Sequence, residues 1–160
     1  MIEENIAMAI DENYPDCEIV MGTSTGGIAH AALAANLLGM PMGYVRGKAK
    51  DHGRTNQIEG KLEKGEKTVV VEDLISTGGS VLETVEALRE AGADVLGIVS
   101  IFNYGMNESI AAFNKAEVEV ISLSNLDALV NVAVRNKYIE FGQRGKILNF
   151  RNDPEHWYKG

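Results

Sequence analysis

Cysteine, basic residues and long apolar runs are scarce in this chain of 160 residues, and each shortage excludes a class of protein. The single cysteine, Cys17, rules out an internal disulfide framework, and no Cys/His spacing typical of a zinc site is present. Lys and Arg number 15 against 23 Asp and Glu, and the net charge of −8 argues against a general binder of nucleic acid or membrane surfaces. No apolar run approaches the roughly 20 residues of a membrane-spanning helix, and the N-terminus is acidic where a signal peptide is basic. We therefore expect a soluble, cytoplasmic protein with no nucleic-acid or membrane partner.

The residues that are present suffice for a folded core, since 45% of them are hydrophobic. We expect one domain over residues 1–160, in which short apolar runs predict strands and apolar positions at helical spacing predict helices. Predicted strands cover residues 18–21, 42–45, 69–71, 95–102 and 118–123, and predicted helices cover residues 2–13, 28–38, 81–91, 107–115 and 127–134. Their alternation predicts an α/β fold with a mostly parallel sheet flanked by helices on both faces.

Two segments lack such periodicity. Residues 46–60 are polar and form a connection longer than most in a compact domain, which predicts a mobile loop with a functional role. The tail from residue 136 is rich in aromatic residues, and we expect it to be irregular. Its aromatic side chains, Trp157 among them, favour packing or a dimer contact over base stacking.

The stretch TVVVEDLISTGGSVLETV, residues 68–85, predicts a strand, a tight loop and a helix in succession. The loop from Ser76 to Ser80 supplies glycines that allow close backbone approach, hydroxyl donors and a helix N-terminus, which together favour a phosphate group. Glu72 and Asp73 lie at the carboxyl end of the strand, where open α/β sheets bind their ligands. Acids next to a phosphate suit sugar hydroxyls or a bound Mg²⁺, so the combination indicates a sugar phosphate.

The tetrapeptide STGG occurs a second time, at residues 24–27, again after an apolar strand and before a helix. Two such loops could bind two phosphate groups of one ligand. The residues alone leave other interpretations open. The acid pair could begin a loop or cap a helix, the first STGG could be a plain turn, and Arg46 and Lys48 could be solvent-exposed charges at a strand edge.

These motifs resemble those of a known family. VVVEDLISTGGS closely resembles the ribose 5-phosphate signature of the type I phosphoribosyltransferases, which use 5-phosphoribosyl-1-diphosphate (PRPP). VMGTSTGGIAHAA is similar to their diphosphate loop, YVRGKAKDHGRTNQIEG to their flexible catalytic loop, and VSIFNYG to the strand that follows the signature. The similarity covers nearly all 160 residues and is greatest to the bacterial orotate phosphoribosyltransferases. It implies the type I phosphoribosyltransferase fold, with a partial hood formed by the C-terminal segment, about residues 124–160.

The resemblance also implies the roles of individual residues. The ribose 5-phosphate of PRPP would be bound by Glu72, Asp73, Ser76, Thr77, Gly78, Gly79 and Ser80. The diphosphate would be bound by Thr23, Ser24, Thr25, Gly26, Gly27, Arg46 and Lys48. The catalytic residues would be Lys50, His52 and Asp73, and Ser76 would also contact orotate. The implied cofactor is Mg²⁺, held mainly by PRPP with no assigned protein ligand, and the implied assembly is a homodimer in which loop 46–60 reaches the partner's active site.

The implied function is the transfer of phosphoribosyl from PRPP to orotate, which gives orotidine 5-phosphate and diphosphate in de novo pyrimidine synthesis. The alternative is a PRPP-binding protein of this family with a different base or no turnover. Three departures bear on it. Family loops have a glycine near Thr55, and some members have an arginine where this chain has Asn103 and Tyr104. The family also begins roughly 50 residues earlier, with a hood segment over the base, which predicts a truncated or internally started chain.

Overall fold

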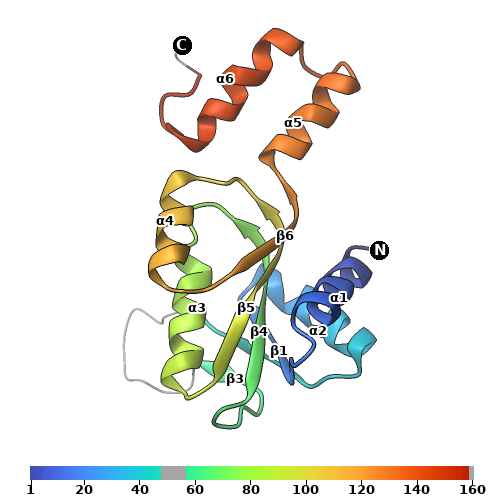
Figure 1. The fold of residues 1–160 in the computed structure, drawn as a ribbon, viewed down its shortest axis with the longest axis vertical. Helices are drawn as coiled ribbons and strands as arrows, with labels where there is room; N and C mark the ends of the chain where they lie inside the picture. Colours follow the sequence, from blue (N-terminus) through green and yellow to red (C-terminus); the bar gives the residue numbers. More distant parts are fainter. Residues whose placement is uncertain (48–56, 159–160) are drawn as a thin grey trace.

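The computed structural model describes residues 1–47 and 57–158, and its centre is a six-stranded sheet with the strand order β3-β2-β1-β4-β5-β6 (Figure 1). The strands are β1 (Ile19–Thr23), β2 (Met42–Val45), β3 (Ile58–Glu59), β4 (Lys67–Ile75), β5 (Asp94–Asn103) and β6 (Val120–Asn125). All neighbouring pairs are parallel except β2 and β3, which are antiparallel. The mostly parallel sheet predicted from the sequence is therefore confirmed.

Helices cover both faces of this sheet, as predicted (Figure 1). The helices α1 (Ile2–Asn13) and α2 (Gly26–Leu38) cover one face, and α3 (Gly79–Glu90) and α4 (Asn107–Lys115) cover the other. The valines of β4 alternate between the two cores, because successive side chains of a strand point to opposite faces. Val69 and Val71 belong to the core under α1 and α2, and Val70 belongs to the core under α3. Among the described residues, no helix is long and apolar enough to cross a membrane.

The structure corrects two expectations about irregular segments. Residues 46–60 were predicted as one loop, but Ile58 and Glu59 form β3, where Ile58 pairs with Val45. The tail after residue 136 was predicted to be irregular, yet it contains η1 (Phe141–Gln143), α6 (Arg144–Leu148) and η2 (Asn149–Arg151). These are single turns, too short for apolar periodicity, and η1 begins with a capping box between Glu140 and Gln143.

We call residues 126–158 the C-terminal arm. It begins with α5 (Leu126–Arg135) and lies beyond the carboxyl ends of β5 and β6 (Figure 1). Its end returns to the sheet, where the ring centroid of Phe150 lies 5.3 Å from that of Tyr104, just after β5. A hydrogen bond of 3.0 Å between the side chains of Asn107 and Asn152 also holds the end of the arm against the start of α4. The arm is therefore attached at both ends to the edge of the sheet at which parallel strands finish.

Candidate active site at the carboxyl edge of the sheet

The two STGG loops lie side by side because the strands before them, β1 and β4, are neighbours in the sheet. The helix after β1 covers one face and the helix after β4 covers the other, so the two loops diverge between β1 and β4. In open α/β sheets this is the point at which ligands bind. The two loops are therefore adjacent, as the binding of two phosphate groups of one ligand would require.

Glycines bring the first loop directly onto the acid pair. A Cβ added to Gly27 would lie 2.4 Å from the carbonyl oxygen of Val71, and one added to Gly26 would lie 2.1 Å from Oδ2 of Asp73. No larger residue fits at either position without a shift of backbone or of the carboxylate. The first turn of α2, which follows the N-cap Thr25, therefore lies directly against the Asp73 carboxylate near the end of β4.

The second loop places the exposed first turn of α3 beside these acids. Gly78 is the N-cap of α3, with a φ of +83° and no side chain to satisfy the free N–H groups of the helix. Behind the loop, Gly78 lies against the ring of Phe113 from α4, which is buried. Thr77, Gly79 and Ser80 are exposed and Ser76 is half-buried, so N–H and hydroxyl donors remain available to an anion.

Glu72 and Asp73 differ sharply in environment, although they are adjacent. The strand continues through both acids to Ile75, so Glu72 points inward and is only 5% exposed, whereas Asp73 is exposed. Burial, and then the neighbouring Asp73 carboxylate, raises the pKa of Glu72 to about 8. The N–H of Asp73 donates to Oε1 of Glu72 at 3.0 Å and opposes this rise. Near neutral pH Glu72 is therefore largely protonated and can donate a hydrogen bond, while Asp73 can accept one.

Thr23 adds a further polar group at the end of β1. Its hydroxyl is buried and has no hydrogen-bond partner among the described residues, although it lies close enough to Glu72 to favour the charged carboxylate. A buried hydroxyl without a partner is rare in native structures and is explained by water or a ligand. This observation supports the prediction that Thr23 belongs to the site.

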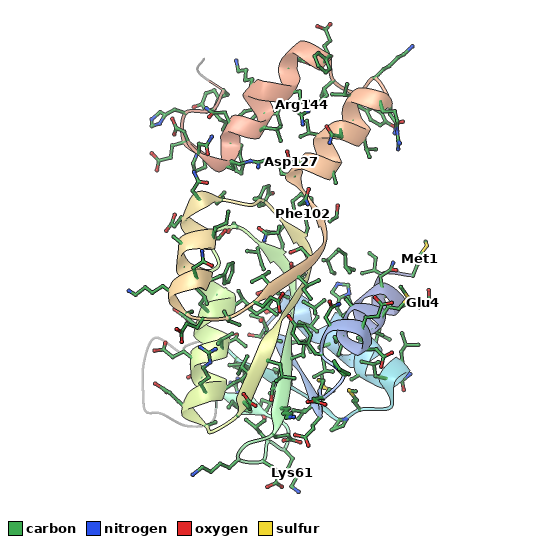
Figure 2. All side chains as sticks on the ribbon, viewed as in Figure 1. Met1, Glu4, Lys61, Phe102, Asp127 and Arg144 are labelled. Atoms are coloured by element: carbon green, nitrogen blue, oxygen red, sulfur yellow. The ribbon has the colours of Figure 1, made fainter. Side chains whose placement is uncertain are left out.

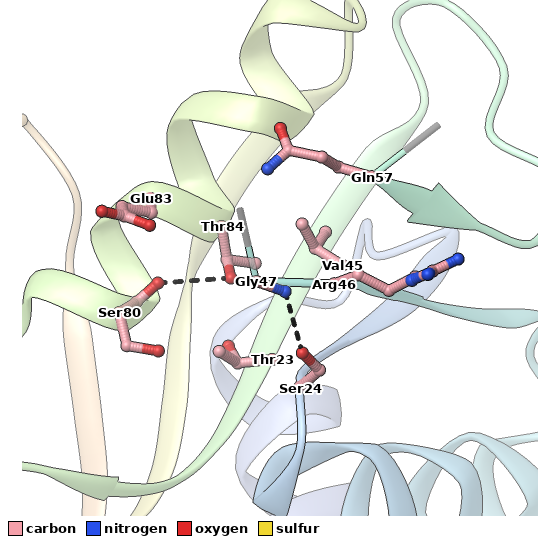
Figure 3. A pocket seen from close by; sticks show the side chains of 9 residues that line it. All are labelled: Thr23, Ser24, Val45, Arg46, Gly47, Gln57, Ser80, Glu83 and Thr84. Atoms are coloured by element: carbon pink, nitrogen blue, oxygen red, sulfur yellow. Dashed lines mark hydrogen bonds between the residues drawn. The ribbon is translucent and has the colours of Figure 1, made fainter. Parts of the chain in front are cut away.

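A pocket of about 30 Å³ joins the two loops to the start of the segment that follows β2 (Figure 3). The pocket is lined by Thr23, Ser24, Val45, Arg46, Gly47, Gln57, Ser80, Glu83 and Thr84. The hydroxyl of Ser24 accepts a hydrogen bond of 3.1 Å from the N–H of Gly47, which ties the first loop to this segment. Three of these residues, Gln57, Glu83 and Thr84, are not among the residues predicted for the site, although Glu83 and Thr84 follow Ser80 at the helical spacing of three and four residues.

Arg46 does not direct its charge into the pocket. Its Nη1 donates to Oε1 of Glu59 at 2.8 Å beside the β2–β3 pair, and the Arg46 side chain is largely exposed while that of Glu59 is partly exposed. An exposed ion pair of this kind is worth at most about 1 kcal/mol, so a bound anion can compete for the guanidinium. The other predicted residues of this segment, Lys48, Lys50 and His52, lie outside the described residues.

Comparison with known proteins gives the family. Residues 2–133 match the phosphoribosyl transferase domain. The chain is 49% identical over 160 residues to the orotate phosphoribosyltransferase of Bacillus subtilis. The matched region covers 99% of this chain and 74% of that protein. The crystal structure of orotate phosphoribosyltransferase from Aeropyrum pernix matches with a TM-score of 0.75 and 27% identity, over 86% of this chain and 76% of that one.

A second solved structure that this chain resembles is a complex with PRPP. The orotate phosphoribosyltransferase of Mycobacterium tuberculosis in complex with PRPP matches with a TM-score of 0.65 and 25% identity, over 79% of this chain and 75% of that one. The fold, the family match over residues 2–133 and the 49% identity over 99% of this chain all agree. The chain therefore belongs to the phosphoribosyltransferase family and, within it, to the orotate phosphoribosyltransferases.

Proposed function

We propose that this chain is an orotate phosphoribosyltransferase, which transfers the phosphoribosyl group of PRPP to orotate and releases diphosphate, in de novo pyrimidine synthesis. The observation that carries this proposal is the pair of STGG loops on either side of Glu72 and Asp73, in a chain 49% identical to an orotate phosphoribosyltransferase. The alternative of a different base or of no turnover is not favoured by the relatives that match most of this chain, which are orotate phosphoribosyltransferases.

The ribose 5-phosphate part of PRPP would bind at the second loop. Ser76, Thr77, Gly79 and Ser80 offer backbone and hydroxyl donors at the positive end of α3, and Gly78 allows the close approach. Protonated Glu72 can donate to one ribose hydroxyl oxygen, and a carboxylate oxygen of Asp73 can accept from a ribose hydroxyl. The acid pair thus suits a ligand that both donates and accepts, as a diol does.

The diphosphate would bind at the first loop, with donors from Thr23, Ser24, Thr25, Gly26 and Gly27. Arg46 would exchange its partly exposed partner Glu59 for diphosphate oxygens, which a planar guanidinium can contact two at a time. We propose that Lys48 adds a second cation there, and that Lys50 and His52 act on the reacting groups. The residues that surround the diphosphate would therefore come from both sides of the pocket.

In the reaction, the bond between the ribose carbon C1 and the diphosphate oxygen breaks as the bond from C1 to an orotate nitrogen forms. The diphosphate leaves with the electron pair of the broken bond, and the proton of the orotate nitrogen passes to solvent or to the diphosphate. Charge grows on the departing diphosphate while C1 becomes oxocarbenium-like. Donors fixed around the diphosphate before the reaction stabilise that charge, and the two loops hold C1 in line between the leaving group and the base. Lys50 would neutralise the leaving group, and His52 would donate a hydrogen bond or proton to it.

Mg²⁺ is part of this proposal as a cofactor held mainly by PRPP. The described residues contain no group of three or more His, Cys, Asp or Glu side chains that could hold a metal ion. Magnesium commonly binds through one or two carboxylates and substrate phosphates, and exposed Asp73 beside the proposed diphosphate loop fits that pattern. When bound, the ion would supply positive charge to the phosphate oxygens.

The base would bind beside the second loop, under the C-terminal arm. Ser76 is half-buried at the end of β4 and is proposed to contact orotate, beneath a partial hood formed by residues 124–160. We further propose a cytoplasmic homodimer in which the segment 46–60 of one subunit reaches the active site of its partner.

The test is the loss of orotate absorbance in the presence of this chain, PRPP and Mg²⁺, with PRPP binding measured by calorimetry on the same preparation. Turnover that requires both PRPP and Mg²⁺ is expected. PRPP binding without orotate turnover would overturn the assignment of the base while leaving the PRPP site intact. Absence of PRPP binding would overturn both.

A further inference from the structure

The guanidinium of Arg151, in the C-terminal arm, has a donor that is buried and unused. Its Nη2 donates to Oδ2 of Asp127 at the start of α5, but its Nε is buried and has no acceptor within the described part of the chain. Leaving a buried donor unsatisfied costs about 1–3 kcal/mol, more when the group is charged. Such groups in native structures are explained by water, an ion or a ligand. The arm therefore holds a cation with capacity for one more acceptor.

A short series of contacts ties Arg151 to the proposed active site. Phe150, the preceding residue, has its ring centroid 5.3 Å from that of Tyr104, which follows β5 directly. The N–H of Tyr104 donates at 3.0 Å to the carbonyl of Ile75, the last residue of β4 and the residue before Ser76. Asn152, on the other side of Arg151, is hydrogen-bonded to Asn107 of α4. Arg151 is thus attached to the strand ends beside the second STGG loop.

The neighbouring strand ends offer apolar surface but no cation. Leu74 is exposed by 46% and pairs with Phe102 of β5, whose ring contacts Tyr104 edge-on with centroids 5.3 Å apart. The residues that close β5, Asn103 and Tyr104, carry no positive charge. An aromatic and aliphatic surface suits the flat face of a pyrimidine ring, while a ring carboxylate needs a charged donor. Figure 2 shows Asp127, the partner of Arg151, at the end of the arm nearest the sheet, toward Phe102.

We propose that Arg151 binds the carboxylate of orotate and thereby selects this base, while Asp127 holds the guanidinium in position through Nη2. This inference rests on the proposed function and names the residue that recognises the group by which orotate differs from uracil. A planar guanidinium offers fixed N–H donors that match a carboxylate, so a lysine would replace its charge without its geometry. Arg151 would act on base affinity and leave PRPP binding alone.

The test compares Arg151→Gln with Arg144→Gln in the whole chain. Arg144 is a matched control, because it lies in the same arm, donates to Asn131 at 3.0 Å and is placed farther from the sheet (Figure 2). We expect Arg151→Gln to raise KM for orotate by about tenfold or more, the loss of one charged hydrogen bond. PRPP affinity by calorimetry should be unchanged, and the preference for orotate over uracil should fall by the same factor. Arg144→Gln should match the wild type, and Arg151→Lys should recover part of the loss.

Removing Arg151 alone leaves the half-buried Asp127 carboxylate unpaired, which could loosen the arm. The double variant Asp127→Asn/Arg151→Gln removes both charges and keeps a neutral hydrogen-bonding pair. A wild-type KM for orotate in folded Arg151→Gln or in the folded double variant overturns the inference. An equal loss of PRPP and orotate affinity in the double variant also overturns it. Failure of the wild-type chain to turn over or bind orotate overturns the proposed function, and this inference with it.

Discussion

Gly78→Ala is the most direct perturbation of the second STGG loop, because two separate costs meet at this residue. Gly78 has a φ of +83°, and alanine in that conformation costs about 1–2 kcal/mol. The new Cβ would also lie 2.7 Å from Cζ of Phe113, whereas ordinary contact begins at 3.4 Å. Phe113 is only 6% exposed, so its ring cannot turn away freely, and overpacking of this kind costs about 1–3 kcal/mol. The free energy of unfolding should fall by about 2–5 kcal/mol.

Gly65→Ala separates the two costs. Gly65 has the same φ of +83°, but an added Cβ would meet no atom within 4 Å. Urea unfolding should therefore show only the conformational cost, about 1–2 kcal/mol, for Gly65→Ala. Adding Phe113→Leu to Gly78→Ala should recover part of the larger loss, since the ring atom that clashes is removed. Equal losses for Gly65→Ala and Gly78→Ala would refute the argument from the Phe113 contact.

The same pair of variants tests the function of the loop. Relief of the clash must displace Gly78 or Phe113, and displacement of Gly78 moves the N–H groups that are proposed to bind the 5-phosphate. PRPP affinity, measured by calorimetry on folded protein, should fall for Gly78→Ala and stay at the wild-type value for Gly65→Ala. An unchanged affinity for Gly78→Ala would place the phosphate elsewhere.

Three further predictions concern charged residues. Asp73→Asn should weaken PRPP binding directly in a calorimetric titration, because the amide offers the ribose hydroxyls one neutral acceptor oxygen in place of two charged ones, and unchanged binding would remove Asp73 from the site. The raised pKa of Glu72 means that the folded state holds a proton that the unfolded state has lost, so the free energy of unfolding should decrease as pH rises from 4.5 to 8, by up to about 5 kcal/mol. Denaturant unfolding across that range should show this slope in the wild type and a reduced slope in Glu72→Gln. Lys50→Ala should lower kcat far more than PRPP affinity, in parallel rate and binding measurements, and equal losses in both would contradict a role confined to the reaction step.

Much of the fold follows from local patterns in the sequence. The predicted bounds of α1, β2 and α4 agree with the structure, because each combines a regular apolar pattern with a clear break, such as Pro15 or the Gly39–Pro41 turn. The strand–loop–helix form of both STGG segments was predictable in the same way, whereas the pairing of β1 with β4 that makes the loops adjacent is not contained in either local pattern. The two acids were placed correctly near the end of β4.

The features that could not be predicted depend on contacts between distant residues. β3 pairs with β2 through only two residues, which is too short for a periodic pattern in the sequence to predict a strand. The Arg46–Glu59 ion pair beside this strand pair could therefore not be predicted either. The opposite environments of Glu72 and Asp73 arise because the strand runs on to Ile75, which turns one acid inward. The arm folds through a capping box and aromatic contacts with Tyr104, neither of which a hydrophobic pattern records.

The pairing of β1 with β4 has a consequence for how the site comes into existence. Ile19 pairs with Thr68, 49 positions later in the chain, and the two loops lie together only after that pairing has formed. Closing a segment of this length carries an entropic cost before any ligand contact offsets it, and such long-range pairings slow folding. The two halves of the site are therefore brought together only by the fold of the whole sheet. A ligand that bridges the two loops binds only the folded domain, and it stabilises that domain as a whole by an amount that grows with the logarithm of the ligand concentration above its dissociation constant.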